Sequence, residues 1–252
     1  MTGAVSGRIP ADPWAPLRAT TQARIGLGRA GMSLPTRAVL ELQASLSAAR
    51  DAVHVPLDVD ALLPGLTGLG LGDPIVLASR AGDRGTYLRR PDLGRAPTSV
   101  DSLPSAGWDV GVVVADGLSS KAVSEHAVAM LEALVQALDA DLTVGPPVLV
   151  TQARVAVGDA IGQAMGVRTV LVLVGERPGL SVADSLGIYL THEPRPGRTD
   201  AERNCISNIH PPEGLGYRAA AATAANLVRG ARALGRSGVD LKDSAGPAPL
   251  PG

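Results

Sequence analysis

Residues 166–180 read GVRTVLVLVGERPGL, and this stretch indicates the fold of the chain. The run from Val170 to Val174 is continuously apolar, with charge only at its edges. Such a run is typical of a strand that is buried on both faces, as in the middle of a parallel sheet. The next residues break the strand and expose the charges of Glu176 and Arg177. Ligands of open α/β sheets bind just outside the carboxyl ends of the strands, so we predict a ligand crevice beside these two residues.

Segments on both sides of this stretch alternate between strand and helix patterns. We predict further strands at residues 74–78, 110–115, 147–150 and 187–190. Helical spacing of apolar residues, or a turn followed by such spacing, predicts helices at residues 35–49, 120–138, 151–166, 181–186 and 217–234. The alternation predicts an α/β fold, namely a parallel-sheet, Rossmann-like domain that follows a small helical N-terminal domain.

A glycine-rich segment marks the expected boundary between these domains. Residues 64–73 read PGLTGLGLGD, which is typical of a linker. We therefore predict an N-terminal arm and helical domain over residues 1–66 and an α/β domain over residues 67–242. The first 13 residues and the Pro/Gly-rich tail over residues 243–252 are expected to be disordered.

The composition restricts the class of protein. Hydrophobic residues make up 45% of the 252 residues, but Phe is absent, so the core must consist of aliphatic side chains. A net charge of -1 lacks the basic excess that nucleic-acid binding requires. A single Cys excludes an internal disulfide and fits a reducing compartment. The sequence shows neither a signal peptide nor an apolar run long enough to span a membrane, so we expect a cytoplasmic protein without nucleic-acid or membrane partners.

Two motif matches do not carry a function. Gly26 to Gly31 match the G-x-G-x-x-G dinucleotide pattern, but no convincing strand precedes them and Pro35 interrupts the helix that should follow. Asp116, Ser120 and His126 suggest a Ser-His-Asp triad, but the G-x-S-x-G pattern is absent and His126 is expected in the middle of a helix. No metal-ligand spacing and no P-loop is present.

The arginine-rich segment at residues 87–95 leaves two interpretations open. Its guanidinium groups could hold a phosphate or a carboxylate. They could equally belong to a solvated loop with ion pairs.

Five segments, in order, resemble the small (light) subunit of ethanolamine ammonia-lyase. They are ARIGLGRAG at residues 23–31 with LPT at 34–36, YLRRPDLGR at 87–95, VADGLS at 114–119, VLVGERPGL at 172–180 and CISNIH at 205–210. Their order and spacing hold from about residue 14 to about residue 235.

This resemblance implies one subunit of a two-subunit, adenosylcobalamin-dependent lyase that converts ethanolamine to acetaldehyde and ammonia. The large subunit of that family is a barrel that carries the substrate, and the small subunit closes over the cobalamin from the other side. The radical chemistry belongs to the cofactor, so we expect no catalytic acid or base and no metal ligand in this chain. The cofactor contacts that the resemblance implies are Val155, Glu176 and Cys205.

Two departures from related patterns refine these expectations. The sequence lacks the D-x-H-x-x-G pattern with which some cobalamin proteins replace the lower base of the cofactor by a histidine. The resemblance therefore implies that the lower base stays on cobalt. The N-terminal arm is short, whereas longer arms in relatives are linked to packaging into a bacterial microcompartment, so packaging is doubtful for this chain.

Two other classes of function compete with the lyase subunit. One is a stand-alone nucleotide-binding or hydrolytic α/β enzyme, against which the missing P-loop and nucleophile elbow argue. The other is a non-catalytic assembly module, for which the charged turn at Glu176 and Arg177 has no evident use.

Overall fold

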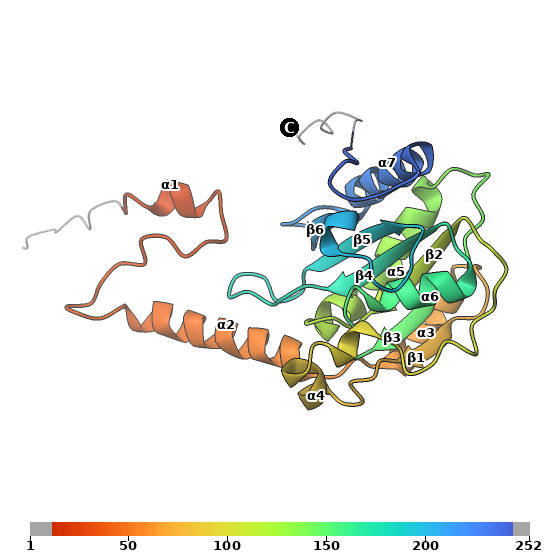
Figure 1. Ribbon diagram of the computed structural model, residues 1–252. Coiled ribbons are helices and arrows are strands. Elements are labelled where there is room, and N and C mark those ends of the chain that lie inside the picture. The colour runs from red at the N-terminus through yellow and green to blue at the C-terminus, as the bar shows by residue number, and fades with distance from the viewer. Residues whose placement is uncertain (1–11, 244–252) are drawn as a thin grey trace, which may run out of the picture. The chain divides into compact units, whose positions relative to one another are not determined.

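A computed structural model describes residues 12–243 of the protein (Figure 1). The predictions of disorder for residues 1–11 and 244–252 lie outside these residues. The chain divides into two compact units, residues 1–48 and residues 49–252, which we describe separately. The predicted domain boundary at residue 66 remains a prediction.

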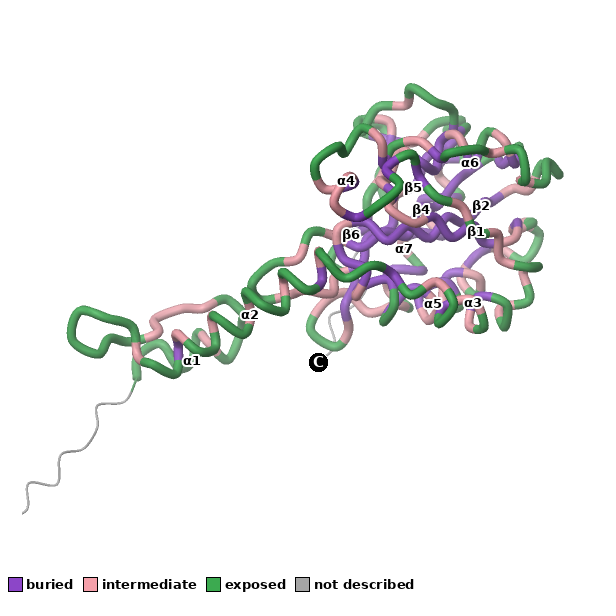
Figure 2. The backbone as a smooth tube through the Cα atoms, turned by 90° about the horizontal axis from the view of Figure 1, so that it is seen from below, coloured by how far each residue is buried: buried purple, intermediate pink, exposed green. Residues whose placement is uncertain are grey.

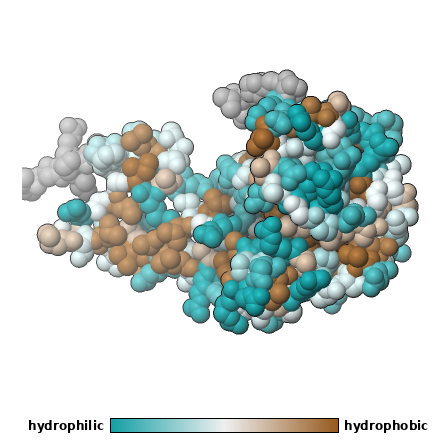
Figure 3. Space-filling model, in the orientation of Figure 1, coloured by the Kyte–Doolittle hydropathy of each residue, from teal (hydrophilic) through white to brown (hydrophobic). Residues whose placement is uncertain are grey.

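The first unit contains the short helix α1 (Ala15–Arg18) and most of helix α2 (Thr36–His54), which extends beyond the predicted residues 35–49. Arg18 donates to the carbonyl oxygens of Ile25 and Gly26 and so ties α1 to the following loop. Apolar side chains lie at the surface of this unit (Figure 3), and Met32, Leu40 and Leu46 are among them.

The second unit is built on a six-stranded mixed sheet with the strand order β1-β3-β2-β4-β5-β6. The strands are β1 (Ile75–Ala78), β2 (Val110–Ala115), β3 (Val148–Thr151), β4 (Thr169–Gly175), β5 (Leu186–His192) and β6 (Asn204–Ile209). Strands β1, β3, β2 and β4 are parallel, as predicted. Strands β5 and β6 are antiparallel to their neighbours, so the expectation of a parallel sheet holds for four strands only.

The connection between β4 and β5 explains the change of direction. Residues 176–185 contain no helix, and the predicted helix at 181–186 is wrong because Leu186 already begins β5. A parallel connection needs a crossover of a dozen or more residues, usually with a helix, whereas an antiparallel strand can return through a loop.

The helices of this unit cover both faces of the sheet (Figure 2). They are α3 (Val59–Thr67), α4 (Arg84–Arg89), α5 (Ser120–Ala137), α6 (Val157–Met165) and α7 (Tyr217–Leu234), with the 3₁₀ turns η1 (Leu93–Arg95) and η2 (Asp200–Glu202). Helices α3, α5 and α7 pack on one face, over a buried cluster of Leu, Val and Ala side chains. Helix α6 packs on the other face, over a second cluster that includes Val150, Ile161 and Val172.

The order of the strands places a crevice at their carboxyl ends. The connection after β2 runs through α5 on one face, and the connection after β3 runs through α6 on the other face. Ligands of α/β sheets bind where neighbouring connections diverge in this way. The backbone comes very close here, because a side chain on Gly175 would lie 2.0 Å from the carbonyl oxygen of Ser119.

Within residues 12–243, no helix combines the length and the apolar character that crossing a membrane would require.

Candidate functional site

A cavity of about 410 Å³ lies at the carboxyl ends of β2, β3 and β4, and we call it the strand-end crevice. It is lined by residues from five segments: Tyr87, Gly117, Leu118, Arg154, Val155, Val174, Gly175, Glu176, Arg177 and Tyr189. Two of the three predicted contact residues, Val155 and Glu176, therefore line the same crevice. The crevice lies where the sequence pattern of β4 predicted it.

Glu176 is held by three donors on one side of the crevice. Its carboxylate accepts hydrogen bonds from the hydroxyls of Ser185 and Ser207 and from the backbone N–H of Asn208, the last at 3.1 Å. These bonds tie the loop after β4 to β6. The carboxylate has about four lone-pair sites, so it retains capacity for one more donor from a ligand.

Cys205 lies beside the crevice and does not line it. It pairs with Tyr189 in the register of β5 and β6, and Tyr189 does line the crevice. Cys205 is a free cysteine that is exposed to solvent. Packing around the sulfur raises the pKa of the Cys205 thiol, so the thiol is neutral at pH 7.

Asp116 organises the turn that carries Val155. Its carboxylate is fully buried and accepts from the backbone N–H groups of Gln152 (2.8 Å) and Ala153 (2.9 Å). Gln152 has a φ of 56°, which is a strained conformation for a residue with a side chain. Burial raises the pKa of Asp116, whereas the two backbone donors and Arg84 stabilise its charged form.

Two guanidinium groups lie against Tyr87, on segments that follow β1 and β3, whereas Glu176 and its donors lie at the β4, β5 and β6 side of the sheet. The centre of the Arg84 guanidinium is 4.8 Å from the ring centroid, and that of Arg154 is 4.5 Å from it. The Tyr87 hydroxyl donates to the carbonyl oxygen of Ala153 at 3.2 Å, and burial raises the pKa of Tyr87 to about 12. Nη2 of Arg84 and Nε of Arg154 are buried without an acceptor among the described residues.

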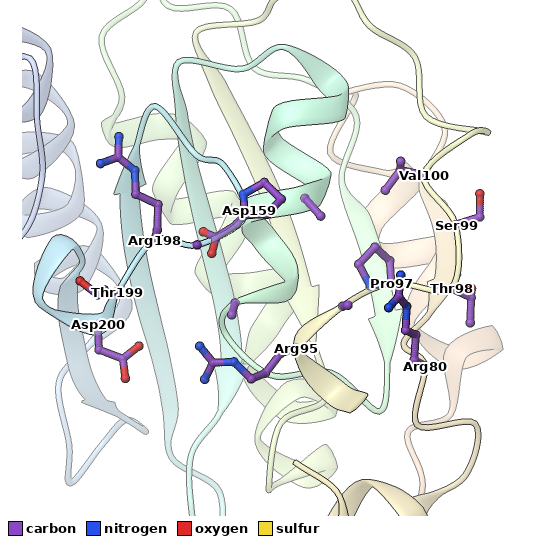
Figure 4. Close-up of a pocket in the computed structure, with 15 residues that line it drawn as sticks. Arg80, Arg95, Pro97, Thr98, Ser99, Val100, Asp159, Arg198, Thr199 and Asp200 are labelled. Atoms are coloured by element: carbon purple, nitrogen blue, oxygen red, sulfur yellow. The ribbon is translucent and has the colours of Figure 1, made fainter. Parts of the chain in front are cut away.

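A second, larger cavity of about 750 Å³ lies between α6 and the loops around residues 95–100 and 196–200. Figure 4 shows its lining side chains, which include Arg80 and Arg95. Its buried carboxylate, Asp159, is paired with Arg203 through two contacts of 2.6 Å. None of the three predicted contact residues lines this cavity, and we therefore place the candidate site in the strand-end crevice.

The residues of the rejected triad have other partners. The Ser120 hydroxyl donates to the carbonyl oxygen of Val55, and His126 Nδ1 is hydrogen-bonded to the Tyr217 hydroxyl at 2.7 Å. No hydrogen bond among the described residues joins Asp116, Ser120 and His126 in a relay, which agrees with the rejection of that motif.

Glu125, His126 and Asp184 come close enough to suggest a metal site. The ammonium group of Lys121 already lies between the two carboxylates, 2.7 Å from Glu125 and 2.6 Å from Asp184. Both carboxylates thus already bind a side-chain cation, and this cluster is better described as an ion-pair network.

Sequence reasoning missed the roles of Arg84, Tyr87 and Arg154. The sequence carried part of the signal, because Asp116 directly follows the end of β2 and Arg154 comes soon after the end of β3. The stacking on Tyr87 could not be foreseen, since it depends on where α4 packs.

Comparison with known proteins agrees with the resemblance noted from the segments. Residues 11–242 match the family model described as ethanolamine ammonia-lyase light chain (EutC). A protein of Rhodococcus erythropolis named ethanolamine ammonia-lyase small subunit is 60% identical over 233 residues, which cover 92% of this chain and 91% of that protein. A protein of the same name from Azotobacter vinelandii is 50% identical, with 98% of this chain and 95% of that protein covered. A third, from Ralstonia nicotianae, is 48% identical, with coverage of 94% and 90%.

Proposed function

Because this chain belongs to the family of ethanolamine ammonia-lyase small (light) subunits, we propose that it is the small subunit of an adenosylcobalamin-dependent lyase that converts ethanolamine to acetaldehyde and ammonia. The observation that carries this proposal is the match along nearly the whole chain, at 60% identity to a relative of that name. The family name also implies a large subunit as the partner, with which this chain would form a hetero-oligomer in the cytoplasm.

The strand-end crevice suits part of such a cofactor and cannot enclose all of it. Its volume of about 410 Å³ lies near the lower end of the range of roughly 300–1,000 Å³ that is usual for drug-sized ligands. A corrin ring with a nucleotide tail is much larger than these ligands. A partner subunit that covers the remainder of the cofactor accounts for this difference.

The residues of the crevice fit the binding of a cofactor with many polar groups. A buried guanidinium donor on Arg154, which lines the crevice, lacks an acceptor among the described residues, and a cofactor rich in amide and phosphate oxygens would supply one. We propose that Val155, Glu176 and Cys205 contact the cofactor, Glu176 as an acceptor for a cofactor amide. We also propose that the lower base stays on cobalt.

The chain's contribution to the reaction is then binding, orientation and the exclusion of water. When bound, adenosylcobalamin supplies the radical that abstracts a hydrogen atom from the substrate. Glu176 is already hydrogen-bonded to Ser185 and Ser207, and Asp116 to backbone groups, so neither is arranged as a general base. We propose that no residue of this chain is a catalytic acid or base.

Co-expression with a large subunit tests the proposal. Acetaldehyde release from ethanolamine and adenosylcobalamin should require both chains, and the large subunit alone should be inactive. Glu176→Gln and Cys205→Ala should raise the cofactor concentration needed for half-maximal rate, whereas Asp92→Asn, at an exposed ion pair with Arg90, should not. A large subunit that is fully active alone would contradict the proposal.

A further inference from the structure

Positive charge exceeds negative charge around Tyr87. The guanidinium groups of Arg84 and Arg154 both lie against its ring, and Asp116 is the carboxylate that contacts either of them, at 3.3 Å from Arg84. Glu176 is bound by its own donors across the crevice. Burial of a guanidinium without a counter-charge is costly. A further anion would therefore stabilise the side of the crevice formed by Arg84, Tyr87 and Arg154.

Arg154 is the guanidinium that faces the crevice. It lines the cavity, whereas Arg84 lies beneath, with its Nη1 directed to Asp116 and to the carbonyl oxygen of Gly117. Nε of Arg154 is buried and has no acceptor among residues 12–243. Its contact with the face of the Tyr87 ring restricts the position of the group, and a guanidinium fork presents paired donors that match a phosphate or a carboxylate.

The turn that carries Arg154 is held rigid from below. Asp116 accepts from Gln152 and Ala153, and the N–H of Arg154 itself donates to the carbonyl oxygen of Gly94 at 2.8 Å. The guanidinium is thereby placed before any ligand binds, which lowers the entropy lost on binding.

We propose that Arg154 binds the phosphodiester of the nucleotide tail of the cobalamin, an inference that rests on the proposed function. The corrin amides are neutral, and the phosphodiester is the anionic group of the tail, so it alone supplies the missing negative charge. Arg177 also lines the crevice, but it is exposed, and water screens its charge.

A comparison of two cofactors on four proteins tests this inference. Adenosylcobinamide keeps the corrin ring and its amides but lacks the nucleotide and the phosphodiester. Dissociation constants for it and for adenosylcobalamin would be measured by visible absorbance and calorimetry, without turnover. The proteins are complexes of the large subunit with the wild-type chain, Arg154→Met, Arg154→Lys and Arg95→Met. The last variant is the matched control, because Arg95 is an exposed arginine of the second cavity.

We expect Arg154→Met to weaken adenosylcobalamin binding by roughly 10- to 100-fold, as for the loss of a charge-assisted hydrogen bond. Adenosylcobinamide should bind this variant and the wild type within about twofold of each other, since no phosphodiester is lost. Arg154→Lys should retain part of the cobalamin affinity, because its charge remains but its paired donors do not. Arg95→Met should bind both cofactors like the wild type.

Equal weakening of both cofactors by Arg154→Met, or no weakening of either, would overturn the inference. If Arg154→Met fails to assemble, the same selectivity is read from Arg154→Lys. If the wild-type complex binds adenosylcobalamin but not adenosylcobinamide, the decisive measurement is how the affinity for adenosylcobalamin depends on salt concentration. This dependence should be steeper for the wild type than for the variant. Equal slopes would refute the assignment. A wild-type complex that binds neither cofactor would contradict the proposed function itself.

Discussion

The two sides of the strand-end crevice differ in how their polar groups are satisfied. On one side, Glu176 is surrounded by the donors Ser185, Ser207 and Asn208, all within the chain. On the other side, Arg84 and Arg154 each keep a buried donor without an acceptor in the part of the chain that the structure describes. The side with Glu176, whose polar groups are paired within the chain, stabilises the fold. The side with Arg84 and Arg154, which we call the unsatisfied wall, has donors available for a ligand.

The largest effect should come from Asp116→Ala, which removes the one carboxylate beneath the unsatisfied wall. The variant leaves Arg84 buried without its counter-charge and two backbone N–H groups without an acceptor. We expect the free energy of unfolding to fall by about 3–5 kcal/mol in urea denaturation. Asp92→Ala is the control at an exposed ion pair and should change nothing measurable. A similar, small change in both variants would show that Asp116 does not support this wall.

The second largest effect should come from alkaline pH, which should lower the free energy of unfolding through ionisation of Tyr87. The pKa of Tyr87 is raised to about 12 in the folded protein, against 10.0 for a free tyrosine. The unfolded chain therefore releases this proton first, so the stabilisation is complete below pH 10 and is lost as pH rises toward 12. The loss should reach about 2–3 kcal/mol, measured as the free energy of unfolding against pH.

Burial also raises the pKa of Tyr189, on the Glu176 side, so both sides contribute to the alkaline loss. Tyr87→Phe should remove the part that belongs to Tyr87 and flatten the pH profile accordingly. If the dependence of the free energy of unfolding on pH is the same in Tyr87→Phe as in the wild type, the pKa of Tyr87 is not raised by burial.

The smallest effects should come from single substitutions on the two sides of the crevice. In the absence of ligand, Glu176→Gln should lower the free energy of unfolding by about 1 kcal/mol, because a charged acceptor of three donors is replaced by a neutral one. Arg154→Met should be close to neutral, since the lost contact with the Tyr87 ring is offset by the removal of a partly buried charge whose Nε has no acceptor among the described residues. Both values come from urea denaturation of the same preparation. Destabilisation by Arg154→Met that exceeds that of Glu176→Gln would reverse the assignment of the two walls.

The first parts of the fold follow from local sequence patterns. The continuous apolar runs of β2 and β4 and the helical spacing of α5 and α7 predicted these elements within a few residues. The direction of β5 could not be predicted in the same way, because an apolar run fits either direction. The loop at residues 176–185 contains Pro178 and Gly179, but a helix was expected at its end.

The candidate site likewise contains residues that the sequence patterns predicted and residues that they did not. Local sequence patterns were enough to predict that Glu176 follows a buried strand and that Val155 follows the strand before it, because strand ends are marked by changes in local composition. The meeting of Arg84, Tyr87 and Arg154 near Asp116 depends on the packing of the folded chain. These residues come from α4 and from the ends of two different strands, and whether a buried charge finds a partner depends on distances in space, which spacing along the chain does not fix.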